Sequence, residues 1–294
     1  MIEKRLVQWY ASDAGVDLDI AEREIALTYV LRILADQGIL ARLAFKGGTA
    51  IRKLHLGNQG RFSLDLDFTA LGGTDPEALI LDLAGVLHNQ THHGIAFTIP
   101  PEDYYANPDS CGAEVSYQHD WVATGRFGVQ VSFRAQPLLP VAPTALRRER
   151  YFDWLGIEPP MVPALDLHEI IGEKVRAAAQ RSRVRDLYDL YQLAAQRFDR
   201  NVVRRVAVIK CWETNFAFDP VVFLNGISRG HYDWADLRRL VKRGWEIPPE
   251  MIIRGVQNGF AFLSALTEEE ALLAGDPYNR QQAAYRSLVE RLGG

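Results

Sequence analysis

Two aspartates separated by a single residue, Asp65 and Asp67, lie in a segment that reads RFSLDLDF. Ser63 continues the same alternation, so a strand here would present all three polar side chains on one face and the apolar residues on the other. Carboxylates two residues apart on a strand lie about 6–7 Å from each other. Mg²⁺ prefers carboxylate and phosphate oxygens, so this spacing predicts metal-dependent chemistry on a nucleotide. The alternative is a solvated strand face on which Arg61 is one more surface residue.

A double glycine precedes this segment. The apolar run from Leu43 to Phe45 predicts a buried strand that leads into Gly47 and Gly48, and Thr49 is expected to cap the helix that follows. Glycines allow a backbone to approach a phosphate closely, and a helix N-terminus offers unpaired N–H groups. The pattern therefore favours a phosphate site beside the carboxylates. A tight turn that binds no ligand is the alternative.

A lysine further along occupies a position in an otherwise apolar helical stripe. Lys174 follows apolar residues at i, i+4 and i+7 spacing, where a lysine is expected to be ion-paired or to extend outward along its stem. Asp186 and Asp189, one turn apart on the next predicted helix, are candidate partners. The alternative places Asp186 on a surface helix with Arg183 and Arg185 as its ion partners.

The elements that must position these residues change in kind along the chain. Asp19 with Glu22 predicts a capping box at the start of an N-terminal helix, and Pro76 predicts the start of another. Short β runs are expected between residues 95 and 133, and helices follow Pro163. The fold class is therefore α+β, with a mixed α/β region over residues 1–160 and a helical region over residues 161–294.

Basic residues gather in three places, and their role is open between RNA contacts and solvated helix faces. The clusters are Arg147, Arg148 and Arg150; Arg200, Arg204, Arg205 and Lys210; and Arg238, Arg239, Lys242 and Arg243 beside Trp245. No histidine or cysteine spacing suggests zinc, and no serine-nucleophile elbow is present.

The composition bounds the function class. The 294 residues carry a formal net charge of −4, so no overall positive field would recruit nucleic acid. Two cysteines without metal-type spacing favour a reducing compartment. The sequence shows neither a signal peptide nor an apolar run that would span a membrane, so a cytoplasmic location without a membrane partner is expected.

Three blocks in order, KGGTAIRKL, RFSLDLDF and EKVRAAAQRSRVRDLYDLY, make residues 40–195 resemble the AbiEii-type nucleotidyltransferase toxins. These include the MenT-like toxins, which have the DNA polymerase β-like nucleotidyltransferase fold. The resemblance implies a nucleotide-side turn at Lys46, Gly47, Gly48 and Thr49 with Ser63, and metal-binding carboxylates at Asp65 and Asp67. It implies that Lys174 is the family lysine and that the essential acid is Asp186 or Asp189, with spacing favouring Asp189.

The same resemblance implies an activity. The chain would use Mg²⁺, or Mn²⁺ as the alternative, to move a nucleoside monophosphate from an NTP to RNA. The expected acceptor is a tRNA 3′ end, which would block translation, and an AbiEi-like antitoxin would neutralise the toxin. Polymerase β-type enzymes usually have a third metal carboxylate, for which Glu114 is the candidate. A protein acceptor, or a non-catalytic nucleotide- or RNA-binding module, are the alternatives.

Overall fold

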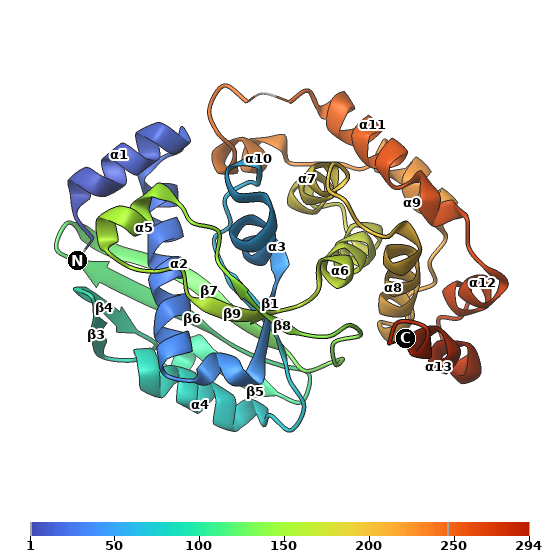
Figure 1. The fold of residues 1–294 in the computed structure, drawn as a ribbon, viewed down its shortest axis with the longest axis horizontal. Helices are drawn as coiled ribbons and strands as arrows, with labels where there is room; N and C mark the ends of the chain where they lie inside the picture. The colour runs from blue at the N-terminus through green and yellow to red at the C-terminus, as the bar shows by residue number, and fades with distance from the viewer. Residues whose placement is uncertain (1, 246, 294) are drawn as a thin grey trace. The chain divides into compact units, whose positions relative to one another are not determined.

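A computed structural model of the chain describes residues 2–245 and 247–293, and for residues 122 and 123 it describes the backbone alone. It confirms the α+β class (Figure 1). Contacts divide the chain into two compact units. The first comprises Met1–Pro137, Val141–Leu165 and Arg239–Gly244, and the second comprises Leu138–Pro140, Asp166–Arg238 and Trp245–Gly294.

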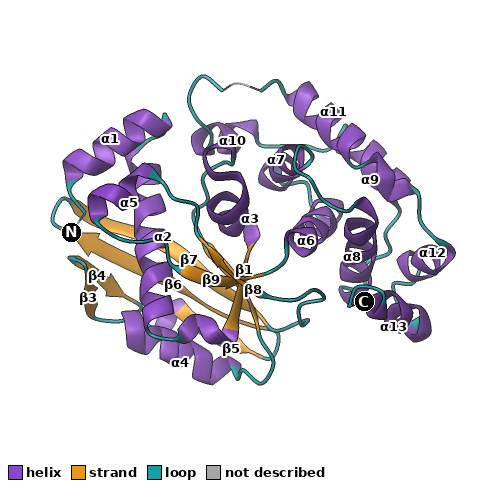
Figure 2. Cartoon of the chain, in the orientation of Figure 1, coloured by secondary structure: helices purple, strands orange, loops and turns teal. Residues whose placement is uncertain are grey.

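One mixed sheet organises the first unit (Figure 2). In the described part of the chain it has nine strands in the order β3-β4-β6-β7-β2-β1-β9-β8, and β5 pairs with β6. The strands are β1 Leu43–Lys46, β2 Leu66–Ala70, β3 Gln90–His92, β4 Ile95–Thr98, β5 Tyr104–Asn107, β6 Ser110–His119, β7 Val122–Ser132, β8 Ala142–Ala145 and β9 Met161–Ala164.

Strand β2 lies between an antiparallel and a parallel neighbour. It pairs antiparallel with β1, where Lys46 is opposite Asp67, and parallel with β7, where Asp67 is opposite Gln130. Leu66 and Phe68 are buried, whereas Asp67 points to the opposite face because side chains alternate along a strand. The end of β1, from which the double glycine leaves, therefore lies directly beside Asp67.

The first unit also contains α-helices. They are α1 Lys4–Ala14, α2 Leu18–Asp36, α3 Gly47–Ala50, α4 Pro76–Leu87 and α5 Arg150–Leu155. α2 crosses the sheet near β6 and β7, and α4 packs against β5 and β6 (Figure 1). The predicted start of α4 is confirmed, since Pro76 is its first residue and the Asp75 side chain accepts a hydrogen bond from the Ala78 N–H at 2.8 Å.

The predicted capping box at the start of α2 is wrong. The helix begins at Leu18, so Asp17 rather than Asp19 precedes it. Glu22 is buried, and its carboxylate accepts hydrogen bonds from Tyr117 and His119 of β6. A buried carboxylate must find donors, and partners about a hundred residues away satisfy it in place of the helix end.

The second unit is helical in its described residues. Its elements are α6 Leu167–Gln180, α7 Val184–Leu193, α8 Arg200–Glu213, α9 Pro220–Ile227, α10 Trp234–Leu240, α11 Pro249–Gly259, α12 Glu268–Ala274 and α13 Gln282–Glu290. α6 and α8 pack closely at Gly172, where an added Cβ would overlap the Val206 side chain. The Asp166 side chain caps α6 by accepting a hydrogen bond from the His168 N–H. No described helix is long and apolar enough to cross a bilayer.

After α10 begins in the second unit, the chain returns to the first. Within Arg239–Gly244, the Leu240 carbonyl accepts a hydrogen bond from the Phe62 N–H at 2.7 Å. The Arg243 N–H donates to the Gly15 carbonyl at 2.7 Å, and its guanidinium pairs with Asp17. We call residues 239–244 the return segment.

Candidate active site

The double glycine forms a tight turn against the polar residues of the RFSLDLDF segment. Gly47 has φ +77°, a left-handed conformation, and an added Cβ would overlap the Asp67 carboxylate. A Cβ on Gly48 would lie 2.5 Å from Arg61 Nη2 and 3.2 Å from Ser63 Oγ. Both glycines are therefore required by contact with the residues beside them, and the turn begins a helix whose first N–H groups have no acceptor within the helix.

The two aspartates lie at the start of β2 rather than along one continuous strand. β2 begins at Leu66, so Asp67 is in the strand and Asp65 precedes it. The predicted strand through Ser63 is therefore wrong. Ser63 and Asp65 also differ in environment, because Ser63 is buried whereas Asp65 is exposed. Asp65 Oδ1 accepts a hydrogen bond from the Gly128 N–H at 3.0 Å, which orients this carboxylate.

Thr49 joins the glycine turn to the aspartates. It is buried, and its hydroxyl donates to the Asp65 carbonyl. It does not cap the helix as expected, because α3 already begins at Gly47. With Lys46 paired in register with Asp67, the first unit brings all the predicted nucleotide-side and metal-side residues of the segment together.

Arg61, which was not among the candidate site residues, lies beside the glycine turn. It is only 5% exposed, which argues against the alternative of a solvated strand face, and its Nη1 donates to the Phe62 carbonyl at 3.1 Å. Its guanidinium lies beside Gly48 and Ser63. A guanidinium recognises phosphate through paired N–H donors. Its position two residues before Ser63, in the same alternation, is the signal that could have identified it.

The carboxylates near β2 would suit a Mg²⁺ ion that has two protein ligands. Glu114, the candidate third carboxylate, is exposed and forms an ion pair with Arg126 at 3.0 Å. Among the residues that the structure describes, no three His, Cys, Asp or Glu side chains are placed to hold a metal together. Asp65 and Asp67 remain, which suits a metal that commonly binds one or two carboxylates and completes its shell with water and substrate phosphates.

The second unit holds a charge cluster composed of Lys174, Arg181, Asp186 and Asp189. Lys174 Nζ lies 2.9 Å from Asp186 Oδ1 and 2.8 Å from Asp189 Oδ2. The Arg181 Nε donates to Asp186 Oδ2 at 2.9 Å. Both aspartate side chains are 3% exposed and Lys174 is 11% exposed, so the predicted pairing of this lysine is confirmed.

The alternative surface arrangement for Asp186 is wrong. Arg185 instead binds Asp236 through two hydrogen bonds of 2.7 Å. Burial by itself would raise the pKa of Asp186, but Lys174 and Arg181 outweigh burial and lower that pKa to about 2. Asp186 therefore stays ionised at neutral pH.

The basic clusters are largely ion-paired. Arg204 binds the buried Glu270 and Lys210 binds the buried Glu169, each at 2.7 Å, so these two cations stabilise the helical core. Arg148 pairs with two exposed carboxylates of its own region. These contacts favour a structural role for several residues of the clusters.

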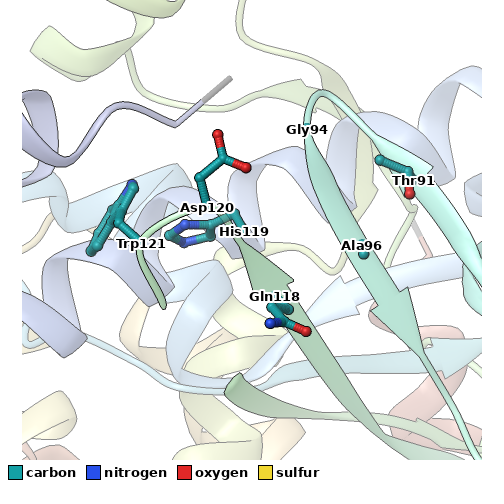
Figure 3. Close-up of a pocket in the computed structure, with 7 residues that line it drawn as sticks. All are labelled: Thr91, Gly94, Ala96, Gln118, His119, Asp120 and Trp121. Atoms are coloured by element: carbon teal, nitrogen blue, oxygen red, sulfur yellow. The ribbon is translucent and has the colours of Figure 1, made fainter. Parts of the chain in front are cut away.

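A separate hollow of about 620 Å³ lies near the β3–β4 hairpin of the first unit (Figure 3). It is lined by Thr91, Gly94, Ala96, Gln118, His119, Asp120 and Trp121. None of the predicted site residues lines it. His119, although it lines the hollow, is bound through its Nε2 to Glu22 at 2.7 Å.

Comparisons with known proteins identify the family of the chain and a structure with a similar fold. The model of the family described as "Nucleotidyl transferase AbiEii toxin, Type IV TA system" matches residues 29–246. The fold is similar to that of MenT4, a nucleotidyltransferase toxin from Mycobacterium tuberculosis H37Rv, with a TM-score of 0.83 over 100% of both chains and 24% sequence identity. The comparison with curated proteins gives no match. The family match covers most of the chain, which therefore belongs to the AbiEii nucleotidyltransferase toxins of toxin–antitoxin systems.

Proposed function

We propose that this toxin transfers a nucleoside monophosphate from an NTP to RNA, at a tRNA 3′ end, and so blocks translation until an AbiEi-like antitoxin neutralises it. One observation carries the proposal. The glycine turn and the buried Arg61, which suit phosphate, lie directly beside the carboxylates of Asp65 and Asp67, which suit a divalent cation. A triphosphate with its metal needs both kinds of group side by side.

The residues of the first unit divide into two roles in this proposal. Asp65 and Asp67 would hold Mg²⁺, which neutralises phosphate charge when bound. The Gly128 N–H donates a hydrogen bond to Asp65 and so orients this carboxylate before a metal ion binds. The phosphates would be bound by the N–H groups of the glycine turn and by the Arg61 guanidinium, together with Lys46, Thr49 and Ser63 around them.

Lys174 and one aspartate of the charge cluster are proposed to serve the same reaction. Two carboxylates fix the Lys174 ammonium, which makes it suitable as a preorganised positive charge for the transferred phosphoryl group. Asp186 bonds two cations and its pKa of about 2 makes it a poor proton acceptor. We therefore assign to Asp189 the role of orienting the attacking hydroxyl.

The test is an acceptor assay with labelled nucleotide. The purified chain is incubated with α-labelled NTPs, total RNA or total protein, and Mg²⁺ or a chelator. Label is expected in the tRNA fraction only when Mg²⁺ is present. Asp65→Asn should reduce labelling by more than about a hundredfold, the order seen when a charge-stabilising group is removed from an active site.

Asp120→Asn is the matched control, since it removes an exposed carboxylate at the separate hollow and should leave labelling unchanged. Undiminished labelling by Asp65→Asn would refute the metal-site assignment. Label in the protein fraction would replace RNA with a protein acceptor, and transfer of γ-label instead of α-label would indicate a phosphotransferase.

A further inference from the structure

The segment that carries Arg61 and Ser63 is not part of the sheet. Residues 60–65 precede β2 and have no strand partner, so the sheet does not fix their backbone. Buried backbone groups nevertheless need hydrogen-bond partners. The groups that supply these partners determine how well the phosphate-side residues are positioned.

Arg52 supplies one of them, at Gly60, and also bonds the chain just before it. It lies in the π-helical stretch Ile51–Leu56, which continues α3 directly after the glycine turn. Its Nη1 donates to the carbonyls of Gly57 at 3.1 Å and Gly60 at 2.8 Å. The guanidinium carbon lies 3.6 Å from the centre of the Phe62 ring. The Arg52 side chain, which is only 2% exposed, thus contacts the chain both before and after Gly60.

The buried charge of Arg52 is compensated from α2. Glu24 Oε1 lies 3.4 Å from Arg52 Nε and 2.7 Å from Lys53 Nζ. Burial would raise the pKa of Glu24, but Lys53 and Arg52 outweigh it, so the net direction is a lowered pKa and an ionised carboxylate. Arg52 is therefore held as a cation in a fixed orientation.

Lys53 shares this carboxylate but does not bond to the segment. Its ammonium donates to Glu24 and, at 2.8 Å, to the Thr28 hydroxyl, both on α2. Arg52 and Lys53, although neighbours in sequence, thus have different structural roles. Lys53 stabilises the helix packing, whereas Arg52 links that packing to the backbone of Gly57–Phe62.

We propose that Arg52 is a positioning residue for phosphate binding: by fixing the backbone from Gly57 to Phe62, it sets the places of Arg61 and Ser63. This inference rests on the proposed function. The role requires the planar fork of arginine, because two carbonyls and an aromatic face are contacted at once. A lysine would keep the charge opposite Glu24 but not this set of contacts.

The experiment compares Arg52→Lys with Lys53→Met. Backbone hydrogen exchange of residues 57–65 is measured without nucleotide, together with unfolding stability and the KM and kcat for the NTP. Arg52→Lys should speed exchange in this segment by about tenfold and raise KM by about tenfold, with a smaller effect on kcat. Lys53→Met should lower stability but leave both the exchange of the segment and KM near their wild-type values.

Phe62→Leu provides a variant that keeps the buried charges, in case Arg52→Lys does not fold. It removes the aromatic face under Arg52, and a rise in exchange and KM of about threefold is expected. Wild-type exchange in this segment in Arg52→Lys or in Phe62→Leu would overturn the proposal. Equal effects of Lys53→Met on the segment would also overturn it. A wild-type chain that labels no acceptor would refute the proposed function, whereas the exchange data would still decide the role of Arg52.

Discussion

Replacing Lys174 with methionine tests the energetics of the charge cluster. The substitution keeps the apolar stem and removes the ammonium that lies between Asp186 and Asp189. Both carboxylates are almost completely buried, so each loses an interaction that water cannot replace. We expect the variant to be less stable and to have no transfer activity.

The magnitude follows from the pKa of Asp186, which is about 2 against an ordinary value of 3.8. At about 1.4 kcal/mol for each pKa unit, the ionised carboxylate contributes about 2 kcal/mol to folding at neutral pH. Because the folded-state pKa is the lower one, this stability is present above pH 4 and is lost as the pH falls toward 2. Asp186 retains Arg181 in the variant, so we expect a loss of about 3 kcal/mol, near the lower end for a broken buried pair.

The assay is urea unfolding followed by the fluorescence of the six tryptophans, at several pH values from 7 to 3. In Lys174→Met the folded-state pKa of Asp186 should rise toward its unfolded value, so the variant should lose less stability than the wild type as the pH falls below 4, and the difference between the two free energies of unfolding should narrow. The double variant with Asp189→Asn should recover at least about 1 kcal/mol, because one buried charge is gone. It should remain inactive.

Lys4→Met, at an exposed position of α1, is the matched control and should change the free energy of unfolding by less than about 0.5 kcal/mol. Suppose Lys174→Met loses less than about 1 kcal/mol and its pH profile superimposes on the wild type. The cluster would then not be the buried ion network described above, and the assignment of Lys174 as a fixed charge would fail with it.

Two further predictions concern single residues. Gly47→Ala should lower the free energy of unfolding by about 1–3 kcal/mol and abolish transfer, because the Gly47 backbone is left-handed and the new methyl group would overlap Asp67. A thermal melt measures the change in stability. The control is Gly85→Ala, at an open position within α4, which should not lower stability. Burial raises the pKa of the Cys111 thiol to about 11 and that of the Cys211 thiol to about 12. Neither thiol should therefore react with a disulfide reagent at pH 8 until the chain unfolds. Rapid labelling of the native protein would contradict the burial of these two residues.

Local signals in the sequence predicted the parts of the site that depend on local geometry. The glycine turn at Gly47 and the proline that begins α4 each require a residue type at a fixed offset from a helix. The pairing of Lys174 with the α7 aspartates also followed from spacing, because the lysine falls on a stripe that must be buried. These features are independent of distant partners.

The errors arose where a distant partner decides the environment. Glu22 has the spacing of a capping box, yet it binds His119 nearly a hundred residues later. Arg61 is a residue type that is usually exposed, yet it is buried beside Gly48 and Ser63. The start of β2 depends on the register with β7, which no local pattern specifies. A single sequence contains no direct record of these long-range contacts.

The return segment has a consequence for how this toxin is made. The Phe62 N–H, next to Arg61, is bonded to the carbonyl of Leu240. A ribosome must therefore synthesise the chain as far as Leu240 before this bond can form, long after the glycine turn and both aspartates have been made. Because domains generally fold as their residues appear, the nascent chain would carry an incompletely fixed nucleotide segment until Leu240 has been made.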